Sequence, residues 1–413
     1  MKEPIWTLAR CTVLLSSACI LLSEHAAAFE TLQLEVREAA GIRRFGYPIA
    51  LALPEETSAS ADTHFRLRDG GKLVPAQFRQ GHTNGGASIW WLDFNISLLP
   101  HEVRFLTLDF GPDIAAAAEP QGLELKRLPD GFEIRNGTEL TWILGDSLRP
   151  LLKSVDAGGL QHVRPQGLGL SVEAPNGVHH DLGEETVASR VVRSGPLAIA
   201  IRYELAPKAG PLAGATSTID LTFPVSKSWV QVDWQIDDPH GKVRSARAKV
   251  AQNLNAPTDK EPTLIDFGAS SLVYLSLAPG TLGKLRASQG NSNAAPPRSW
   301  EVLRGPANAP EPFVVEPSGA EGGSAEGWAH VMDRSRCLAL AIGAFGEEGE
   351  DSIEVAAAGD VNIARKFKTD GASPPTKRSL QFWLHFVGFP PHVTAATSPQ
   401  SMLSPLVVRI NKP

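Results

Sequence analysis

The chain has 413 residues, of which 42% are hydrophobic and 20% charged, and its formal net charge is −6. This mild acidity argues against a nucleic-acid partner, because nucleic acids select basic surfaces. The length is too great for one small core and favours two or three domains. We find no HExxH, GxSxG, P-loop, dinucleotide-binding glycine pattern or Cys/His zinc spacing, which argues against a standard zinc protease, serine hydrolase or NTPase.

The N-terminal residues have the features of a secretory signal peptide. A positively charged start precedes an apolar run over residues 11–22, which is too short to span a bilayer. Small residues then predict cleavage after Ala28, and hence a periplasmic or secreted protein without a membrane association once cleaved. In an alternative interpretation, Cys19 is the acylated residue of a lipoprotein. Cleavage leaves Cys337 alone in an apolar strand, so we expect a buried thiol and no internal disulfide.

Residues 29–113 predict a compact β-barrel domain. Apolar and polar residues alternate over 32–37, which indicates a strand with one buried face. Asp69-Gly70-Gly71-Lys72 lies between two strand-like segments and is typical of a hairpin turn. The domain ends with a strand over residues 104–110, and residues 114–122 are expected to form a linker.

Residues 123–413 contain short β-type segments separated by Gly, Pro and Asn, which predicts a large antiparallel β-sandwich. Within it, residues 289–327 are rich in Pro, Gly, Ser and Ala, and we expect a long surface loop there. The clearest strand covers residues 230–237, where apolar and polar residues alternate without interruption. Its polar face suits hydroxyl-rich ligands and supplies four candidate ligand-binding residues, Gln231, Asp233, Gln235 and Asp237.

Two further strands carry candidate ligand-binding aromatic residues. Trp383 and His385 lie on one face of a predicted strand, together with Gln381. That face could stack against sugar rings or pack against another sheet, and the sequence leaves both alternatives open. Trp90 and Trp91 point to opposite faces of their strand, so one is expected in the core, and we take Trp91 as the ligand-binding candidate.

The order of these segments resembles that of rhamnogalacturonan exolyase-like proteins. The segments that carry the resemblance are residues 43–48, 74–77 and 90–94 of the first domain and residues 194–197, 230–239 and 327–333 of the second. The resemblance implies a RIFT-type β-barrel followed by a β-sandwich, with a polysaccharide or oligosaccharide as ligand. Such lyases carry a third domain, a helical (α/α) toroid, and this sequence ends where the toroid would begin. A partner chain that supplies the toroid is therefore one expectation.

Lyase chemistry would require a base for the proton next to a uronate carboxyl group and a cation that stabilises the resulting enediolate. His180, His240 and Arg244 are the candidate catalytic residues, and the alternative for each is an exposed turn residue. Asp237 and Asp238 are candidate ligands for Ca²⁺, although turns select the same residue types. No other cofactor is expected.

The sequence therefore leaves three functions open. The first is an exported carbohydrate-binding or accessory protein that lacks its own catalytic domain. The second is a polysaccharide lyase that acts alone or with a partner chain. The third is a structural envelope protein without enzymatic activity.

Overall fold

The computed structural model describes residues 30–54, 63–82, 88–115, 121–270, 272–288, 299–306, 308, 311–312, 324–368, 376–388 and 399–411. Within these ranges the protein is built from antiparallel strands, with a single helical turn at Leu182–Glu184 and one short helix, α1 (Pro399–Leu403). The expected all-β class is confirmed. No helix of this described part is long and apolar enough to cross a membrane. The expected signal peptide, Cys19 and most of the expected linker lie outside the described residues.

The N-terminal domain consists of two sheets whose buried side chains share one core. The five-stranded sheet contains, in spatial order, β30 (Val407–Asn411), β1 (Glu30–Arg37), β7 (Val103–Gly111), β3 (His64–Asp69) and β4 (Lys72–Leu73). The three-stranded sheet contains β2 (Arg44–Ala52), β6 (Ser88–Leu98) and β5 (Ala76–His82).

This domain is open, which corrects the expectation of a closed barrel. Among the described residues, no strand pairing joins its two sheets. The chain passes from β4 to β5 through Pro75, which has no backbone N–H to donate and so interrupts the ladder. The expected hairpin is confirmed: β3 pairs with β4, and Gly70 and Gly71 adopt φ values of 52° and 91° at the turn.

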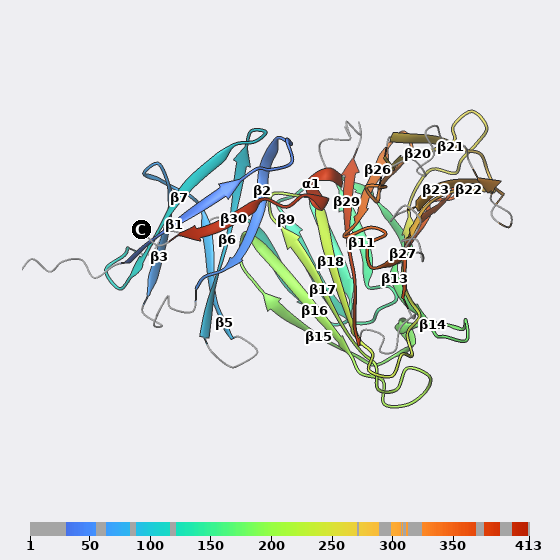
Figure 1. The fold of residues 1–413 in the computed structure, drawn as a ribbon, viewed down its shortest axis with the longest axis horizontal. Coiled ribbons are helices and arrows are strands. Elements are labelled where there is room, and N and C mark those ends of the chain that lie inside the picture. Colours follow the sequence, from blue (N-terminus) through green and yellow to red (C-terminus); the bar gives the residue numbers. More distant parts are fainter. Residues whose placement is uncertain are drawn as a thin grey trace, which may run out of the picture.

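The end of the chain returns to the first domain. Strand β30 pairs with β1 in antiparallel register, and Figure 1 shows the red C-terminal strand among the blue N-terminal ones. Residues 407–411 therefore belong to the first domain and not to the sandwich, where the sequence analysis placed them. This arrangement connects the sandwich to the first domain at two points of the chain.

The second domain is the expected antiparallel sandwich. Its 13-stranded sheet contains β24 (Glu311–Pro312), β23 (Ser299–Pro306), β22 (Thr281–Ser288), β27 (Gly349–Ala356), β28 (Asp360–Phe367), β19 (Ser245–Gln252), β13 (Val163–Glu173), β11 (Leu152–Ala157), β10 (Leu140–Gly145), β9 (Gly131–Asn136) and β8 (Leu123–Leu128), with β12 (Leu160–Gln161) and β14 (His179–Asp181) at its side. Its 9-stranded sheet contains β15 (Val187–Arg193), β16 (Ala198–Leu205), β17 (Thr216–Pro224), β18 (Trp229–Asp237), β29 (Lys377–Gly388), β26 (Arg336–Ile342), β25 (Trp328–Met332), β20 (Thr263–Gly268) and β21 (Leu272–Leu277).

Strand β18 shows how the sequence pattern produces the sandwich. Val232, Trp234 and Ile236 point inward and are at most 1% exposed, while the side chains between them lie on the outer face of the 9-stranded sheet. Burial of such side chains supplies the main stabilising free energy, about 2 kcal/mol for each aliphatic one. The outer face is therefore left to polar residues and to contacts with the N-terminal domain.

Part of the expected long loop is a strand. Residues 299–306 form β23, which pairs with β22, and Trp300 and Val302 are buried in the sandwich core. The sequence around this segment is rich in Pro and Gly and therefore predicts a loop. The short alternation of apolar residues at Trp300 and Val302 forms a strand because it pairs with β22. The rest of the expected loop lies mostly outside the described residues, and there the loop stays a prediction.

Candidate functional site

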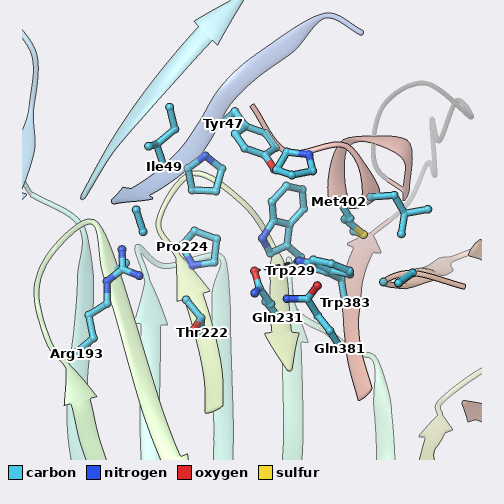
Figure 2. A pocket seen from close by; sticks show the side chains of 17 residues that line it. Tyr47, Ile49, Arg193, Thr222, Pro224, Trp229, Gln231, Gln381, Trp383 and Met402 are labelled. Carbon is cyan, nitrogen blue, oxygen red and sulfur yellow. Dashed lines mark hydrogen bonds between the residues drawn. The ribbon is translucent and has the colours of Figure 1, made fainter. Parts of the chain in front are cut away.

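A pocket of about 450 Å³ lies between the N-terminal domain and the outer face of the 9-stranded sheet. Figure 2 shows Tyr47 and Ile49 of β2 on one side and the polar side chains of β17, β18 and β29 on the other. Short segments 343–344 and 402–405 complete the wall. We refer to this cavity as the interdomain pocket.

Four side chains of β18 and β29 form a hydrogen-bonded row beside the interdomain pocket. The Trp383 Nε1–H donates to Gln231 Oε1 at 3.2 Å, and the Gln231 amide donates to an Asp233 oxygen at 2.7 Å. The Gln381 amide donates to the other oxygen of Asp233. Each donor has one partner in this row, so the orientations of both glutamines are fixed. The remaining amide valences can serve a ligand.

Asp233 is the ionisable member of this row. Burial raises the pKa of its carboxyl group, although the Gln381 and Gln231 amides favour the charged form. The Asp220 carboxylate opposes ionisation further. Asp220 itself is held by Arg202, which donates two hydrogen bonds of 2.7 Å to it.

Gly343 has no side chain, and this leaves room for the side chains of Gln381 and Trp383 at the interdomain pocket. A Cβ atom at this position would lie 2.8 Å from Gln381 Oε1 and 3.5 Å from Trp383 Cζ3. The first distance is shorter than a normal contact, so only glycine leaves the Gln381 side chain in place. The backbone around Gly343 is held by Arg365, which donates to the carbonyl oxygens of Gly343 and Ala344 at 2.7 Å and 3.1 Å.

A buried ion pair fixes Arg365 in turn. Its guanidinium donates to both oxygens of Asp351 at 2.8 Å, and the side chains of these two residues are 1% and 0% exposed. Asp351 also accepts from the Gly346 N–H at 2.7 Å. Such a fork-shaped pair is geometrically demanding, so segment 343–346 has one preferred position.

The N-terminal domain covers the interdomain pocket with aromatic side chains. Tyr47 meets Trp229 in an edge-on contact, with ring centroids 6.2 Å apart. Met402 of α1 is buried beside them. Arg44 links these parts, because it donates to the carbonyl oxygens of Ser401 and Ser404 at 3.1 Å and 2.6 Å. The covering wall therefore depends on segments more than 350 residues apart in the sequence.

A second charged contact closes one end of the pocket. Arg193 of β15 lines the pocket, and its Nε–H donates to Asp93 of β6 at 2.8 Å. Arg79 lies at 3.8 Å from the same carboxylate and stacks over the ring of Trp91. Asp93 is 1% exposed and the Arg193 side chain 12%, so this contact is a largely buried interdomain ion pair.

The structure brings together some of the residues that the sequence predicts for ligand binding. Gln231 and Trp383 line the interdomain pocket, and Asp233 lies directly beside them. Trp383 also packs into the core between the domains and is only 8% exposed, which favours the packing alternative of the sequence analysis. Gln235 and Asp237 follow on the same face of β18 and line neighbouring hollows.

Other candidates lie outside the interdomain pocket. His385 packs edge-on against Trp229 at 6.0 Å, and burial, together with the nearby Lys227 and His330, lowers its pKa to about 3. It is therefore a neutral, half-buried side chain. Trp91 faces Arg79 on the three-stranded sheet.

The candidate catalytic residues do not converge on the pocket. His180 lies on β14 of the 13-stranded sheet, and Arg244 lies 3.5 Å from Glu173. His240 is an exposed turn residue. Asp238 uses its carboxylate for the backbone N–H groups of Lys242 and Val243, both at 2.8 Å, and for Arg378, so it acts as a turn residue. In the described part of the chain, no group of three or more His, Cys, Asp or Glu side chains is placed to hold a metal ion.

Sequence reasoning missed several residues that shape the pocket. Most of these belong to β2, β15, β17, the 343–344 segment and α1, which are brought together only by the tertiary fold: Tyr47, Arg193, Thr222, Trp229, Gly343 and Met402. Trp229 carried one detectable signal, because it continues the polar-face series of β18 by two residues. The others carry no pattern that separates them from ordinary strand and loop residues.

No protein-family model and no curated protein matches the sequence. Two solved structures share the fold, a protein in glycosyl hydrolase family 38 from Enterococcus faecalis and an alpha-mannosidase from Enterococcus faecalis V583. Both give a TM-score of 0.55 over 92% of this chain, at 11% and 10% sequence identity. The chain spans about half the length of these proteins, 47% and 46% respectively. At this identity the likeness establishes the architecture alone, a β-sandwich with a neighbouring β-domain.

Proposed function

We propose that the protein is an exported carbohydrate-binding or accessory protein and that the interdomain pocket holds the saccharide. The observation that carries the proposal is the row of Trp383, Gln231, Asp233 and Gln381 beside a cavity of about 450 Å³. Aromatic faces and amide groups are the chemistry that pyranose rings and their hydroxyl groups require. The volume lies within the range of about 300–1,000 Å³ that is usual for small-molecule sites.

The pocket is preorganised for such a ligand. Both glutamines are already oriented by hydrogen bonds, and the Arg365–Asp351 pair holds the facing segment. A ligand that enters the pocket therefore meets groups whose conformational entropy has been lost during folding, which favours affinity. The two similar solved structures are a glycosyl hydrolase family 38 protein and an alpha-mannosidase, which supports the proposal of a saccharide ligand.

A relation to the rhamnogalacturonan exolyase-like proteins is the second part of the proposal. It is supported by the order of the sequence motifs. Under it, a partner chain with a helical toroid would complete a lyase. Incubation of the protein with rhamnogalacturonan, alone and with such a partner, tests this part, and the appearance of the ultraviolet absorbance of unsaturated uronate would support it.

A glycan array followed by calorimetric titration of the best ligand tests the pocket. Replacement of Gln231 by Leu should weaken binding about tenfold, because a buried ligand hydroxyl group loses its partner. Gln161→Leu is the matched control, since the Gln161 amide also makes two side-chain hydrogen bonds but lies on the 13-stranded sheet. If Gln231→Leu binds every glycan as tightly as the unmodified protein does, the pocket is not the binding site.

A further inference from the structure

The interdomain pocket continues along the outer face of the sheet. A second hollow of about 260 Å³ shares Gly343, Ala344 and Gln381 with it. A third hollow of about 480 Å³ shares Gln235 and Ser379 with the second. The three hollows therefore adjoin one another along β18 and β29, and we refer to the three together as the trough.

The trough is longer than a single sugar ring. Its floor runs on β18 from Gln231 to Asp237, six residues further on, and an antiparallel strand rises about 3.4 Å per residue, which gives roughly 20 Å. Because alternate residues share a face, Gln231, Asp233, Gln235 and Asp237 form one line of polar groups along this length. A chain-like ligand can follow that line.

Part of this line is available to a ligand. Gln235 is exposed, and in the described part of the chain its side-chain amide has no hydrogen-bond partner. Thr222, which lines the first hollow, likewise has a hydroxyl group with no side-chain or backbone partner among the described residues. Donors and acceptors of this kind are satisfied by sugar hydroxyl groups without a change in the protein.

The arginines of the trough are paired within the protein, and Lys377 of the third hollow stands opposite Asp237 in the register of β18 and β29. Each arginine that lines it has a carboxylate partner: Arg193 pairs with Asp93, Arg365 with Asp351 and Arg378 with Asp238. A ligand carboxylate would compete with these buried partners, and the Asp233 carboxylate lies in the same row. Breaking a buried ion pair is costly, so the trough gives an acidic chain little net attraction.

We propose that the trough binds an extended, uncharged glycan chain of several sugar units, laid along β18 and β29. This inference rests on the first part of the proposed function, the saccharide in the interdomain pocket, and names the class of that ligand. The interdomain pocket takes one end of the chain, where Trp383 and the two glutamines hold a ring. The second and third hollows take the following units through Gln235 and its neighbours.

The experiment is a set of calorimetric titrations of the full chain with neutral oligosaccharides of increasing length, namely gluco-, manno-, xylo- and galacto-oligosaccharides of one to six units, and with oligogalacturonides of the same lengths. We expect the affinity for one neutral series to rise at least tenfold between the dimer and the tetramer. Gln231→Leu should weaken binding at every length. Gln235→Ala should weaken only the longer chains, by about fivefold for the loss of one hydrogen bond.

The outcomes separate the two proposals. An affinity that does not depend on chain length, or a Gln235→Ala variant that binds long chains normally, overturns the trough and leaves the interdomain pocket as a site for a short saccharide. Tighter binding of oligogalacturonides than of every neutral series overturns the uncharged ligand. If no saccharide binds in a manner that depends on Gln231, the proposed function itself is wrong. Gln161→Ala is the control and should bind each series like the unmodified protein. Far-UV circular dichroism of every variant tests whether it is folded.

Discussion

Acidification should destabilise the protein through a buried histidine of the sandwich. His162 is 0% exposed and meets Phe386 edge-on at 5.8 Å. In the described part of the chain neither of its ring nitrogens has a hydrogen-bond partner. Burial, with a further contribution from the Arg336 charge, lowers the pKa of His162 from 6.5 to about 4. The folded protein therefore holds this imidazole in its neutral form.

The sign of the effect follows from the two pKa values. Above pH 6.5 the imidazole is neutral in both states and costs nothing, whereas between pH 6.5 and pH 4 only the unfolded chain takes up the proton. The stability contribution is thus lost as the pH falls through this window. A difference of about 2.5 pKa units corresponds to about 3 kcal/mol in the free energy of unfolding between pH 7 and pH 4.

Urea denaturation at several pH values between 7 and 4 measures this loss. His162→Phe removes the titrating group and keeps an aromatic ring beside Phe386. The pH dependence of the free energy of unfolding should become shallower by about 3 kcal/mol over this range in the variant. His240→Phe, at an exposed turn, is the control for the exchange of a histidine for a phenylalanine. Equal pH dependence in the unmodified protein and in His162→Phe would refute the reasoning.

Four further perturbations test the architecture of the site. Gly343→Ala should displace Gln381 and lower ligand affinity about tenfold, which titration measures, whereas Gly169→Ala, on β13 of the other sheet, should not. Arg365→Leu should destabilise the protein by about 3–5 kcal/mol in urea denaturation, and the double change with Asp351→Leu should restore part of this loss. Arg44→Met removes the donor to one carbonyl oxygen within α1 and one just after it, so limited proteolysis should cut the C-terminal segment sooner than in Arg43→Met. Burial raises the pKa of the Cys337 thiol to about 12, so a thiol reagent at pH 8 should modify Cys337 only after denaturant is added.

The local pattern of the sequence was sufficient for the class of the fold and for part of the site. Alternation along β18 predicted which side chains enter the sandwich core, and it placed Gln231, Asp233 and Gln235 together on the other face. These statements concern neighbours on one strand, where the backbone geometry alone decides the direction of each side chain. The turn at Gly70 and Gly71 was predictable because it too depends on local backbone conformation, here on the positive φ that glycine allows.

Only the tertiary structure decided where the pocket lies and what closes it. Tyr47 and Met402 meet at one cavity because the last strand of the chain pairs with the first, and Arg193 reaches it through its ion pair with Asp93. No local pattern encodes these long-range contacts. The same dependence explains the segment 299–306, whose strand exists because β22 pairs with it. The face of a strand on which a side chain lies is determined by the backbone geometry of a few neighbouring residues. The meeting of distant strands depends instead on burial and hydrogen bonding summed over the whole chain.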